Sequence, residues 1–522
     1  MTGAGKTTVG RILAHRIGVE FVDLDTVVET AAGASVADIF AREGEAGFRR
    51  REARAVAEVV AEGGPREAIV ATGGYTMANP SSAAALAAWG PVVCLTASPG
   101  ELAARLAKSP PRPVASEVDR GSIGRLLAGR RKVYDRLPMH VATDGRPPEI
   151  VADQVLGLAA ALGPLAPAAL PADHGRGHYR LLVAPGLLGA LGPLLAAELR
   201  PRRAAVVTDA AVCGLYGGAT EESLTAAGFE VALVPTPPGE VAKCLATVAE
   251  LYEAFARLGL ERRDLVVALG GGVVGDTAGF AAATYLRGLA LVQVPTTLMA
   301  MVDSSLGGKT GVNMPWGKNM VGAFHPPRLV VCDPRTLDTL PVAAIRDGLA
   351  EVVKAGLIGD ADLLTLLEDR GADAVAGPRA AREVVLRAAK VKIDVVAGDP
   401  WEAGSREVLN LGHTFAHGLE AASGYQVSHG AAVAAGLAAA CRLAAGRGLV
   451  GDGFARRIIA LLVDLGLTPG SGEVPTAEVV AAMAADKKRR RGRLRFVLPR
   501  GVGDLAVVDD VTEAEIEAAL TV

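Results

Sequence analysis

Cysteine is scarce in this sequence, and its five cysteines are scattered singly with no C-x-x-C pair. That pattern argues against a disulfide framework or a thiolate metal site and fits a reducing compartment. The sequence also lacks an uninterrupted apolar stretch of about 18 residues, and its first residues do not resemble a signal peptide. We therefore predict a cytoplasmic protein without a membrane-spanning segment.

Aromatic residues are also few, at 4% of the chain, whereas half of the residues are hydrophobic. The cores must therefore be built mainly from Ala, Val and Leu, which suit helices packed on a parallel sheet. A chain of 522 residues is too long for one core, so several domains are expected. The net charge of −3 gives no electrostatic footprint for nucleic acid or an anionic membrane, which leaves small molecules as the expected partners.

Lysine is used sparingly, in only 11 of the 54 Lys and Arg positions. Because Lys offers a compact ammonium rather than a planar fork, a Lys kept in an Arg-rich sequence indicates a geometric need. Chance retention is the alternative for any single one. The lysines of the second half are Lys243, Lys309, Lys318, Lys354, Lys390, Lys392, Lys487 and Lys488.

Alternating strands and helices organise the first part of the chain, a pattern typical of a parallel α/β sheet. We predict a small α/β domain at 1–162, a linker rich in Ala, Pro and Gly at 163–177, a nucleotide-type α/β domain at 178–337, and a mainly helical domain at 338–522. The predicted strands are 21–25, 68–72 and 92–96, then 204–208, 230–234, 264–269, 290–294, 329–332 and 494–498.

A glycine-rich motif, Gly3-Ala4-Gly5-Lys6-Thr7-Thr8, stands at the start of the chain and has the form of the end of a P-loop. In a P-loop, backbone N–H groups cradle phosphate oxygens, the Lys reaches the β- and γ-phosphates and the hydroxyl binds Mg²⁺. A glycine-rich helix start is the alternative. A helical stretch follows directly, which favours the P-loop.

Further polar residues extend this motif. Asp23 and Asp25 end a predicted strand on one face, because side chains alternate along a strand. The other candidates are Arg49 and Arg130 on helices, Gly73 and Gly74 at a glycine turn, and Arg112 in a Pro-rich loop suited to a lid. In this order the motifs resemble shikimate kinase over most of residues 1–160.

The resemblance to shikimate kinase implies ATP with Mg²⁺ as cofactor and shikimate as substrate. Phosphoryl transfer fits such a site, because it needs positioning and charge neutralisation more than covalent help. The implied ATP residues are Gly3, Gly5, Lys6, Thr7 and Arg112, the Mg²⁺ residues Thr7 and Asp23, and the shikimate residues Asp25, Arg49, Gly73, Gly74 and Arg130.

Two departures from the kinase pattern stand in the sequence. The family's first P-loop glycine and the central strand before it are absent, so the sheet is expected to lose its middle. Tyr75 replaces the family's third glycine, and its side chain would crowd the substrate carboxylate. We therefore expect either a start further upstream or a degenerate, non-catalytic kinase domain that serves as a scaffold.

The second α/β region carries a glycine turn, Leu269-Gly270-Gly271-Gly272-Val273-Val274-Gly275-Asp276, between a predicted strand and a helix. Such a turn at a helix N-terminus can hold a pyrophosphate through backbone N–H groups and the helix dipole. Its spacing is not G-x-G-x-x-G, so a tight structural turn remains an equal alternative.

Three of the chain's eight histidines, His413, His417 and His429, fall within seventeen residues. Asn410, His413 and His417 have the spacing of one helix face, and Glu351 is acidic in an otherwise apolar helix. Two imidazoles and one carboxylate leave open positions on Zn²⁺, which is how a catalytic zinc is held. Satisfied core histidines and a helix-capping Glu are the alternative.

Two polar, glycine-rich stretches at 302–310 and 317–320 are predicted to be loops. Each contains a lysine, Lys309 or Lys318, and ammonium groups bind phosphate as point charges. The stretches therefore favour an anionic substrate over a merely solvated surface.

Several motifs in the second part of the chain resemble 3-dehydroquinate synthase in order and spacing, over essentially residues 178–522. They are PPGEVAK, ALGGGVVGD, TYLRG, VPTTLMAMVDSSLGGKTGVN, GKNMVGAFHPP, GLAEVVKAG, LNLGHTFAH, SHGAAVAAG and ADKK. The resemblance implies a Rossmann-like NAD-binding domain followed by a helical metal-binding domain. It also implies a homodimer.

Site residues follow from that resemblance. Glu351, His413 and His429 would bind Zn or Co. Asp209, Glu240, Lys243, Gly271, Gly272, Asp276, Thr296, Thr297 and Lys318 would line NAD. Arg287, Asp303, Lys309, Asn319, Lys354, Lys392, Arg406, Asn410, His417 and Lys487 would hold the substrate and act on it. One departure is Ala431, where the family usually has a Glu beside the metal ligands; losing such a partner costs about 10–100-fold in metal affinity or activity.

The implied function is conversion of 3-deoxy-D-arabino-heptulosonate 7-phosphate to 3-dehydroquinate and phosphate, in the shikimate pathway of aromatic amino-acid biosynthesis. Two rival enzymes share the metal and NAD. Another sugar-phosphate cyclase, such as an inosose synthase, is disfavoured by the attached kinase-like domain. A polyol dehydrogenase would not need the phosphate-binding lysines.

Overall fold

The computed structural model describes residues 3–61, 67–108, 120–175, 177–199, 201–489 and 494–521, without the side chains of 120 and 485–489. By their contacts these residues form two compact units. The first comprises residues up to 171 with 189–202 and 222–230, and the second comprises 172–188, 203–221 and the chain from 231 onward.

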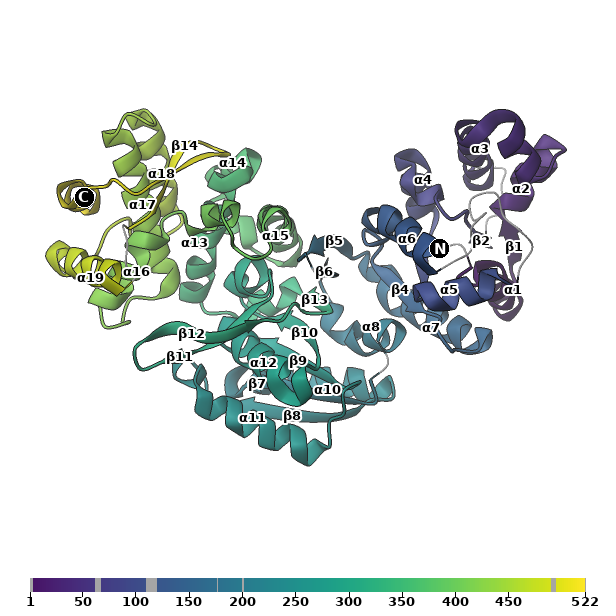
Figure 1. Cartoon of the computed structure of the whole chain (residues 1–522), viewed down its shortest axis with the longest axis horizontal. Coiled ribbons are helices and arrows are strands. Elements are labelled where there is room, and N and C mark those ends of the chain that lie inside the picture. Colours follow the sequence, from purple (N-terminus) through teal and green to yellow (C-terminus); the bar gives the residue numbers. More distant parts are fainter. Residues whose placement is uncertain are drawn as a thin grey trace. The chain divides into compact units, whose positions relative to one another are not determined.

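The first unit is an α/β structure, as predicted (Figure 1). Strands β1 (Glu20–Asp23) and β2 (Ala68–Ala71) pair in parallel, as do β3 (Val93–Thr96) and β4 (Met139–Ala142). Among the described residues, the two pairs belong to separate sheets, which agrees with the expected loss of a central strand. Its helices are α1 (Lys6–Ile17), α2 (Leu24–Ala32), α3 (Val36–Val60), α4 (Pro80–Trp89), α5 (Pro99–Leu106), α6 (Arg120–Tyr134), α7 (Pro148–Leu162) and α8 (Leu191–Glu198).

The predicted strand at 21–25 is too long at its carboxyl end. Asp23 ends β1, and its side chain accepts a hydrogen bond from the backbone N–H of Asp25, so α2 begins at Leu24. An Asp at this position satisfies one of the unpaired N–H groups of the first helical turn. Asp25 therefore lies on a helix rather than on the strand face shared with Asp23.

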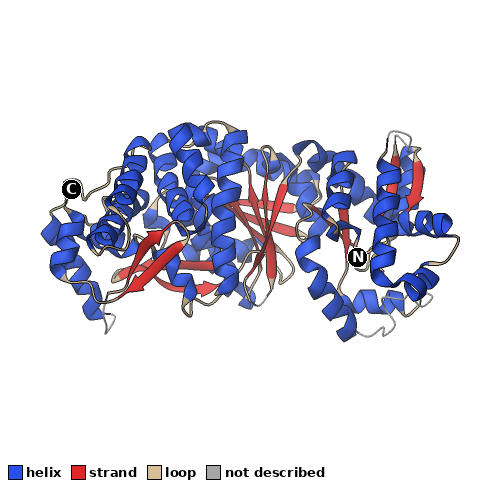
Figure 2. Ribbon diagram, turned by 90° about the horizontal axis from the view of Figure 1, so that it is seen from above, coloured by secondary structure: helices blue, strands red, loops and turns tan. Residues whose placement is uncertain are grey.

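The second unit contains a seven-stranded sheet in the order β5-β6-β13-β10-β9-β7-β8. Its central strands are almost wholly buried, as expected when helices cover both faces of a parallel sheet. Helices α11 (Leu245–Leu258) and α12 (Gly272–Thr284) pack against it, with α12 on β9 and β10 (Figure 1). Figure 2 shows strands in red with helices in blue on both sides of them. The strands are β6 (His178–Val183), β7 (Arg203–Asp209), β8 (Glu230–Thr236), β9 (Leu265–Gly270), β10 (Ala290–Pro295) and β13 (Leu329–Cys332).

Two segments differ from the sequence prediction. The predicted linker contains strand β5 (Ala168–Asp173), which pairs with β6 at the edge of the sheet; an edge strand tolerates Pro171 because one side of it needs no hydrogen-bonding N–H. Of the two predicted loops, residues 302–304 lie in a π-helix, whereas residues 309–310 and 317–320 belong to the strands of an antiparallel hairpin, β11 (Lys309–Met314) and β12 (Gly317–Phe324). Their glycines permit this pairing, because Gly311 and Gly322 face each other with no room for a Cβ.

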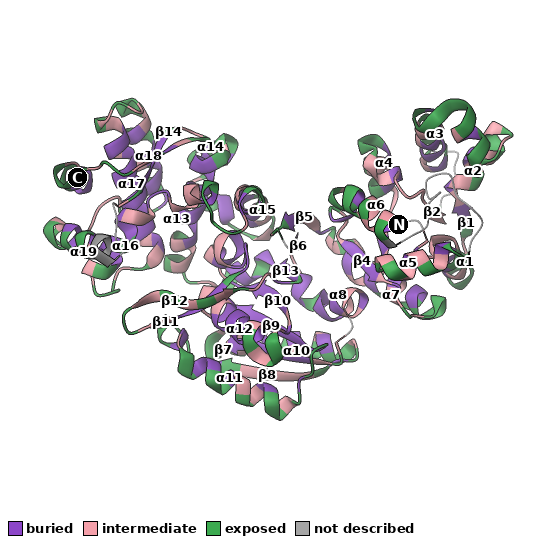
Figure 3. Cartoon of the chain, in the orientation of Figure 1, coloured by how far each residue is buried: buried purple, intermediate pink, exposed green. Residues whose placement is uncertain are grey.

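From α13 onward the second unit is mainly helical, as predicted. Its helices are α13 (Val342–Gly359), α14 (Ala361–Arg370), α15 (Pro378–Gly398), α16 (His413–Ala422), α17 (His429–Gly446), α18 (Asp452–Asp464), α19 (Thr476–Arg489) and α20 (Glu513–Leu520), with a hairpin of β14 (Phe496–Gly501) and β15 (Asp504–Val508). Helix α17 contacts α13, α16, α18 and α20, and Figure 3 shows it largely buried.

Helix α17 is, within the described ranges, the one helix long and apolar enough to cross a membrane. Of its apolar window, 72% is buried inside the protein, which is typical of a core helix. Its small side chains, mostly Ala, let neighbouring helices approach closely.

Candidate metal and nucleotide centre

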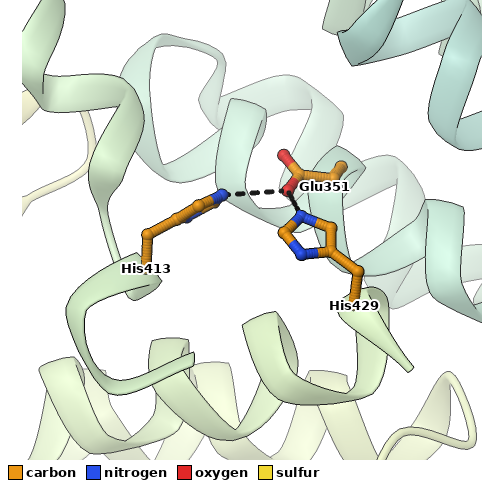
Figure 4. A group of neighbouring side chains, drawn as sticks. All are labelled: Glu351, His413 and His429. Atoms are coloured by element: carbon orange, nitrogen blue, oxygen red, sulfur yellow. Dashed lines mark ion pairs between the residues drawn. The ribbon is translucent and has the colours of Figure 1, made fainter. Parts of the chain in front are cut away.

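Glu351, His413 and His429 converge in the helical part of the second unit (Figure 4). One ligand atom from each lies within 4.8 Å of the others. The Nε2 atoms of both histidines lie 3.5 Å from Oε1 of Glu351. This is the donor set that holds a catalytic zinc with open positions.

Three helices supply these side chains. Glu351 lies on α13, His413 is the first residue of α16 and His429 is the first residue of α17. Gly412 adopts φ 78°, a left-handed conformation that only glycine takes readily, and so turns the chain into α16. Asn410 lies before this turn, in a short 3-10 helix at 405–410, so the prediction that it shares a helix face with His413 is wrong.

Close packing of α16 on α17 depends on Gly436, because a Cβ there would lie 2.1 Å from the carbonyl oxygen of Gly412. We expect Gly436→Ala to force the helices apart, lower the free energy of unfolding by about 1–3 kcal/mol and weaken zinc binding by displacing His413. Thermal unfolding and a zinc-chelator competition would measure both effects. Gly446→Ala on the same helix is the matched control, because its Cβ would meet open space. Equal stability and zinc affinity in the two variants would contradict this account.

The charges at this group fit a cation. Oε1 of Glu351 is buried without a hydrogen-bond partner, and Oε2 faces the ammonium of Lys354. Burial opposes its ionisation, but Lys354 and the histidines hold the pKa of Glu351 well below its usual value. Burial and Lys354 lower the pKa of His413 to about 3, which keeps that imidazole neutral as a metal ligand must be. Burial also opposes a charge on His429, yet Glu351 and Glu420 raise its pKa to about 10. A metal binding there would displace a proton from Nε2.

A chain of charged side chains leads away from this group. Lys354 forms an ion pair with Glu351 and lies 3.8 Å from the carboxylate of Asp303. Lys392 Nζ lies 2.7 Å from Oδ1 of the same Asp303. Burial lowers the pKa of Lys392, whereas Glu351 and Asp303 more than offset the effect of burial at Lys354 and raise its pKa. Two buried ammonium groups beside the metal group suit a phosphorylated substrate.

Other predicted substrate residues lie in several elements. The ring of His417 packs 5.6 Å from that of His413. Arg406 is buried, and its Nε has no hydrogen-bond partner. Lys309 forms an ion pair with Glu402, a residue that the sequence analysis did not single out. The backbone N–H of Asn319 donates to Asn313.

Arg287 lies outside the described contacts of this cluster. Among the described contacts, no hydrogen bond or ion pair links Arg287 to the other predicted substrate residues. It lies in a short turn at 285–287 with φ 66°. Lys487 lies on α19, where its side chain is outside the described residues.

The glycine turn after β9 leads into α12, as predicted, and Gly271 caps that helix without a side-chain hydrogen bond. A Cβ on Gly272 would lie 2.9 Å from Oγ of Ser304, a buried hydroxyl with no hydrogen-bond partner. Uncapped N–H groups and an unpaired hydroxyl fit a pyrophosphate at a helix N-terminus. The second unit thus has a place for a dinucleotide.

Only some of the other predicted NAD residues lie beside this turn. Lys243 Nζ lies 2.6 Å from the carboxylate of Asp276 on α12. A Cβ on Gly271 would lie 3.2 Å from Thr297, and the N–H of Thr296 donates to Gly270. The rest have these partners: Asp209 caps a short helix at 210–212, Glu240 accepts from Asn313, and Lys318 pairs with Glu420.

Glu420 is the main residue that the sequence analysis did not identify. It lies on α16, seven residues after His413 and three after His417, with a side chain only 5% exposed. This spacing puts it on the same helix face as the histidines. An acidic residue on that face of an apolar helix was the signal that could have found it.

In the first unit, the start of α1 has the geometry of a phosphate-binding turn. Gly3 and Gly5 adopt φ 79° and 91°, and Lys6 begins α1. The hydroxyl of Thr7 donates to Asp23 at 2.9 Å, so the two predicted Mg²⁺ residues lie together. Arg112, the predicted lid residue, lies outside the described residues.

The two arginines predicted to bind shikimate both lie close to Tyr75. The guanidinium carbons of Arg49 and Arg130 are each 5.2 Å from the centre of its ring. Arg49 also forms ion pairs with Glu45 and Glu52. The ring of Tyr75 therefore contacts both cations, and its crowding of the substrate carboxylate stays a prediction.

The second unit is similar in sequence to known proteins over the residues of its candidate metal and nucleotide centre. Residues 233–347 match the family model of the 3-dehydroquinate synthase N-terminal part, and residues 348–489 match that of its C-terminal part. The 3-dehydroquinate synthase of Synechococcus sp. (strain CC9605) is 46% identical over 351 residues, which are 66% of this chain and 95% of that protein. The chain belongs to the 3-dehydroquinate synthase family. A relative of the same name from Symbiobacterium thermophilum is also 46% identical, over 67% of this chain and 98% of its own length.

This family member also carries a shikimate kinase domain, since residues 2–159 match that family model. The predicted fusion is thereby confirmed. Among solved structures, 2-epi-5-epi-valiolone synthase from Streptomyces hygroscopicus, with NAD⁺ and Zn²⁺ bound, has a TM-score of 0.61 at 38% identity, over 66% of this chain and 95% of that one. A 2-deoxy-scyllo-inosose synthase with carbaglucose-6-phosphate, NAD⁺ and Co²⁺ has a TM-score of 0.61 at 27% identity, over 67% and 99%. These similarities confirm the Rossmann-like fold followed by a helical domain.

Proposed function

We propose that the second unit converts 3-deoxy-D-arabino-heptulosonate 7-phosphate to 3-dehydroquinate and phosphate. The observation that carries the proposal is the group of Glu351, His413 and His429 joined through Lys354 to a second buried ammonium. A metal held by these three donors would bind an alcohol oxygen of the substrate, and the lysines would bind its phosphate. Proteins named 3-dehydroquinate synthase are 42–46% identical to this chain, and the chain matches nearly their whole length.

NAD and a divalent Zn or Co ion are the proposed cofactors. When bound, NAD supplies a reversible hydride acceptor and the metal supplies Lewis acidity. Glu351, His413 and His429 would hold the metal. The N-terminus of α12, with Gly271 and Gly272, would hold the pyrophosphate.

The protein's own residues then orient the sugar phosphate. Lys354, whose ammonium is buried beside Glu351, would neutralise charge that develops as the phosphate leaves. Asp303 holds both Lys354 and Lys392 in place, since its carboxylate lies between the two ammonium groups. Burial of these groups excludes water and so strengthens their electrostatic effect.

A paired assay of the purified chain tests the proposal against its rivals. With the heptulosonate phosphate we expect phosphate release without net formation of NADH, because the overall conversion is redox-neutral. Net NADH formation would instead identify a polyol dehydrogenase. Turnover of another sugar phosphate, with none of the heptulosonate phosphate, would identify a related cyclase such as an inosose or valiolone synthase.

We also propose a homodimer located in the cytoplasm; light scattering on the purified chain would measure its mass.

We further propose that the first unit transfers a phosphoryl group from ATP to shikimate. The match of residues 2–159 to the shikimate kinase family and the contact of Thr7 with Asp23 support this function. Production of shikimate 3-phosphate by the purified chain would test it. A unit that takes up neither ATP nor shikimate would instead be a scaffold.

Tyr75 is expected to weaken shikimate binding, because its ring lies against both Arg49 and Arg130. Removing the ring with Tyr75→Gly should tighten shikimate binding about 10-fold or more, since opening a charge-assisted contact with a carboxylate adds about 1.5–3 kcal/mol. Isothermal titration would measure the change. Tyr75→Phe is the matched control, because it keeps the ring and should behave as the unmodified chain. Equal affinity in the Gly and Phe variants would contradict the prediction.

A further inference from the structure

Glu420 lies behind the metal ligand His429. Its Oε1 atom is 3.4 Å from Nδ1 of His429 and 3.0 Å from Nζ of Lys318. The other nitrogen of the same ring, Nε2, is 3.5 Å from Glu351. The imidazole of His429 therefore spans two buried carboxylates, one on each side.

The second histidine has the same arrangement with a weaker partner. His413 also directs Nε2 toward Glu351, while its Nδ1 lies 3.2 Å from the backbone carbonyl of Leu411. In both rings, an acceptor at Nδ1 leaves Nε2 as the inward-facing atom. A carboxylate in this outer position fixes the ring orientation and makes the ligand nitrogen more basic than a neutral carbonyl does.

The sequence around His429 offers no acid of its own. Ala431 lies two residues further along the first turn of α17, where its N–H donates to the capping hydroxyl of Ser428. Ser428 in turn donates to Asp347, so that carboxylate is engaged in holding the cap. The acid beside the histidine therefore comes from the neighbouring helix α16.

We propose that Glu420 is the positioning residue of the metal site: it accepts the Nδ1 proton of His429 and so presents Nε2 to the ion. This rests on the proposed metal site. Lys318 shares the same carboxylate oxygen and stacks over Tyr425 at 4.5 Å from the ring centre. Because Lys318 belongs to the hairpin of β11 and β12, Glu420 also ties that hairpin to the metal ligand.

The test is the zinc affinity of Glu420→Gln, measured by chelator competition on the whole chain. Gln keeps the volume but replaces the carboxylate by a neutral amide, so we expect zinc to bind about 10–100-fold more weakly. The visible absorption of the Co²⁺-loaded protein should shift as well, which a purely structural role would not produce. Glu368→Gln is the matched control, because it removes an ion pair between Glu368 on α14 and Arg457 on α18. Zinc affinity equal to that of the control would overturn the proposal.

A second measurement does not depend on the variant being folded. In the unmodified zinc-loaded chain, nitrogen NMR of the imidazoles should show His429 with a proton on Nδ1 and the metal on Nε2. The opposite arrangement would overturn the proposal. Neither result requires turnover, so a different substrate for the synthase would leave this test intact, whereas a chain that binds no zinc would refute the metal site itself.

Discussion

Lys354→Ala is expected to lower the rate of phosphate release by about 10²–10³-fold while leaving the metal bound. Removing one preorganised charged group from a buried reaction site has an effect of this size. Lys354 is only 5% exposed and pairs with both Glu351 and Asp303, so no solvent-exposed side chain can take its place. Phosphate release from the heptulosonate phosphate and the zinc content of the same sample would be measured together.

Lys390→Ala provides the control for this loss. Lys390 lies on α15 and forms an exposed ion pair with Asp394, so its removal should change neither turnover nor metal content. A thermal unfolding curve of each variant separates lost chemistry from lost folding. Turnover retained by Lys354→Ala would refute the role assigned to this ammonium. Loss of zinc in the folded variant would show that Lys354 supports the metal instead.

Glu351→Gln is expected to reduce zinc affinity by more than about 100-fold. This loss exceeds the usual effect of removing a residue that contacts a metal ligand but not the metal itself. The variant removes the anionic ligand of the group and leaves two imidazoles beside the buried charge of Lys354. It should therefore also lose turnover, and added Zn²⁺ or Co²⁺ should restore little of it. Chelator competition and phosphate release are the two measurements.

Reversible chelation of the unmodified chain is the reference for this variant. A chelator should inactivate the synthase, and Zn²⁺ or Co²⁺ should restore it, because the three donors remain in place. Glu407→Gln, which removes the partner of an ion pair with Arg495, should bind zinc normally. A Glu351→Gln chain with unchanged zinc affinity would exclude this carboxylate as a ligand.

Local features of the fold were predictable from sequence. The buried strand β9 is a continuous apolar run, β10 is apolar apart from Gln293, and the glycine turn at 270–272 lies between a strand and a helix as expected. His413 and His417 likewise lie on one helix, α16, as their spacing predicted. These features depend on residues close together in the chain, where helix and strand periodicity applies directly.

Errors arose where pairing with a neighbouring strand, or the conformation of a single turn residue, decides the structure. Strand β5 has the composition of a linker, but the edge of β6 gives its backbone a hydrogen-bonding partner. The hairpin of β11 and β12 forms because glycines on the two strands face each other. Asn410 is separated from α16 by the left-handed Gly412, a turn that spacing alone could not reveal.

The sequence by itself determined the family, the three candidate metal donors and the glycine turn, because motif residues keep their order and spacing wherever the chain goes. Only the tertiary structure decided which side chains meet. It brought the ring of Tyr75 against both Arg49 and Arg130, and it brought Glu420 to the outer nitrogen of His429. Both contacts join residues on different helices or turns, and their formation depends on how these elements pack rather than on any pattern along the chain.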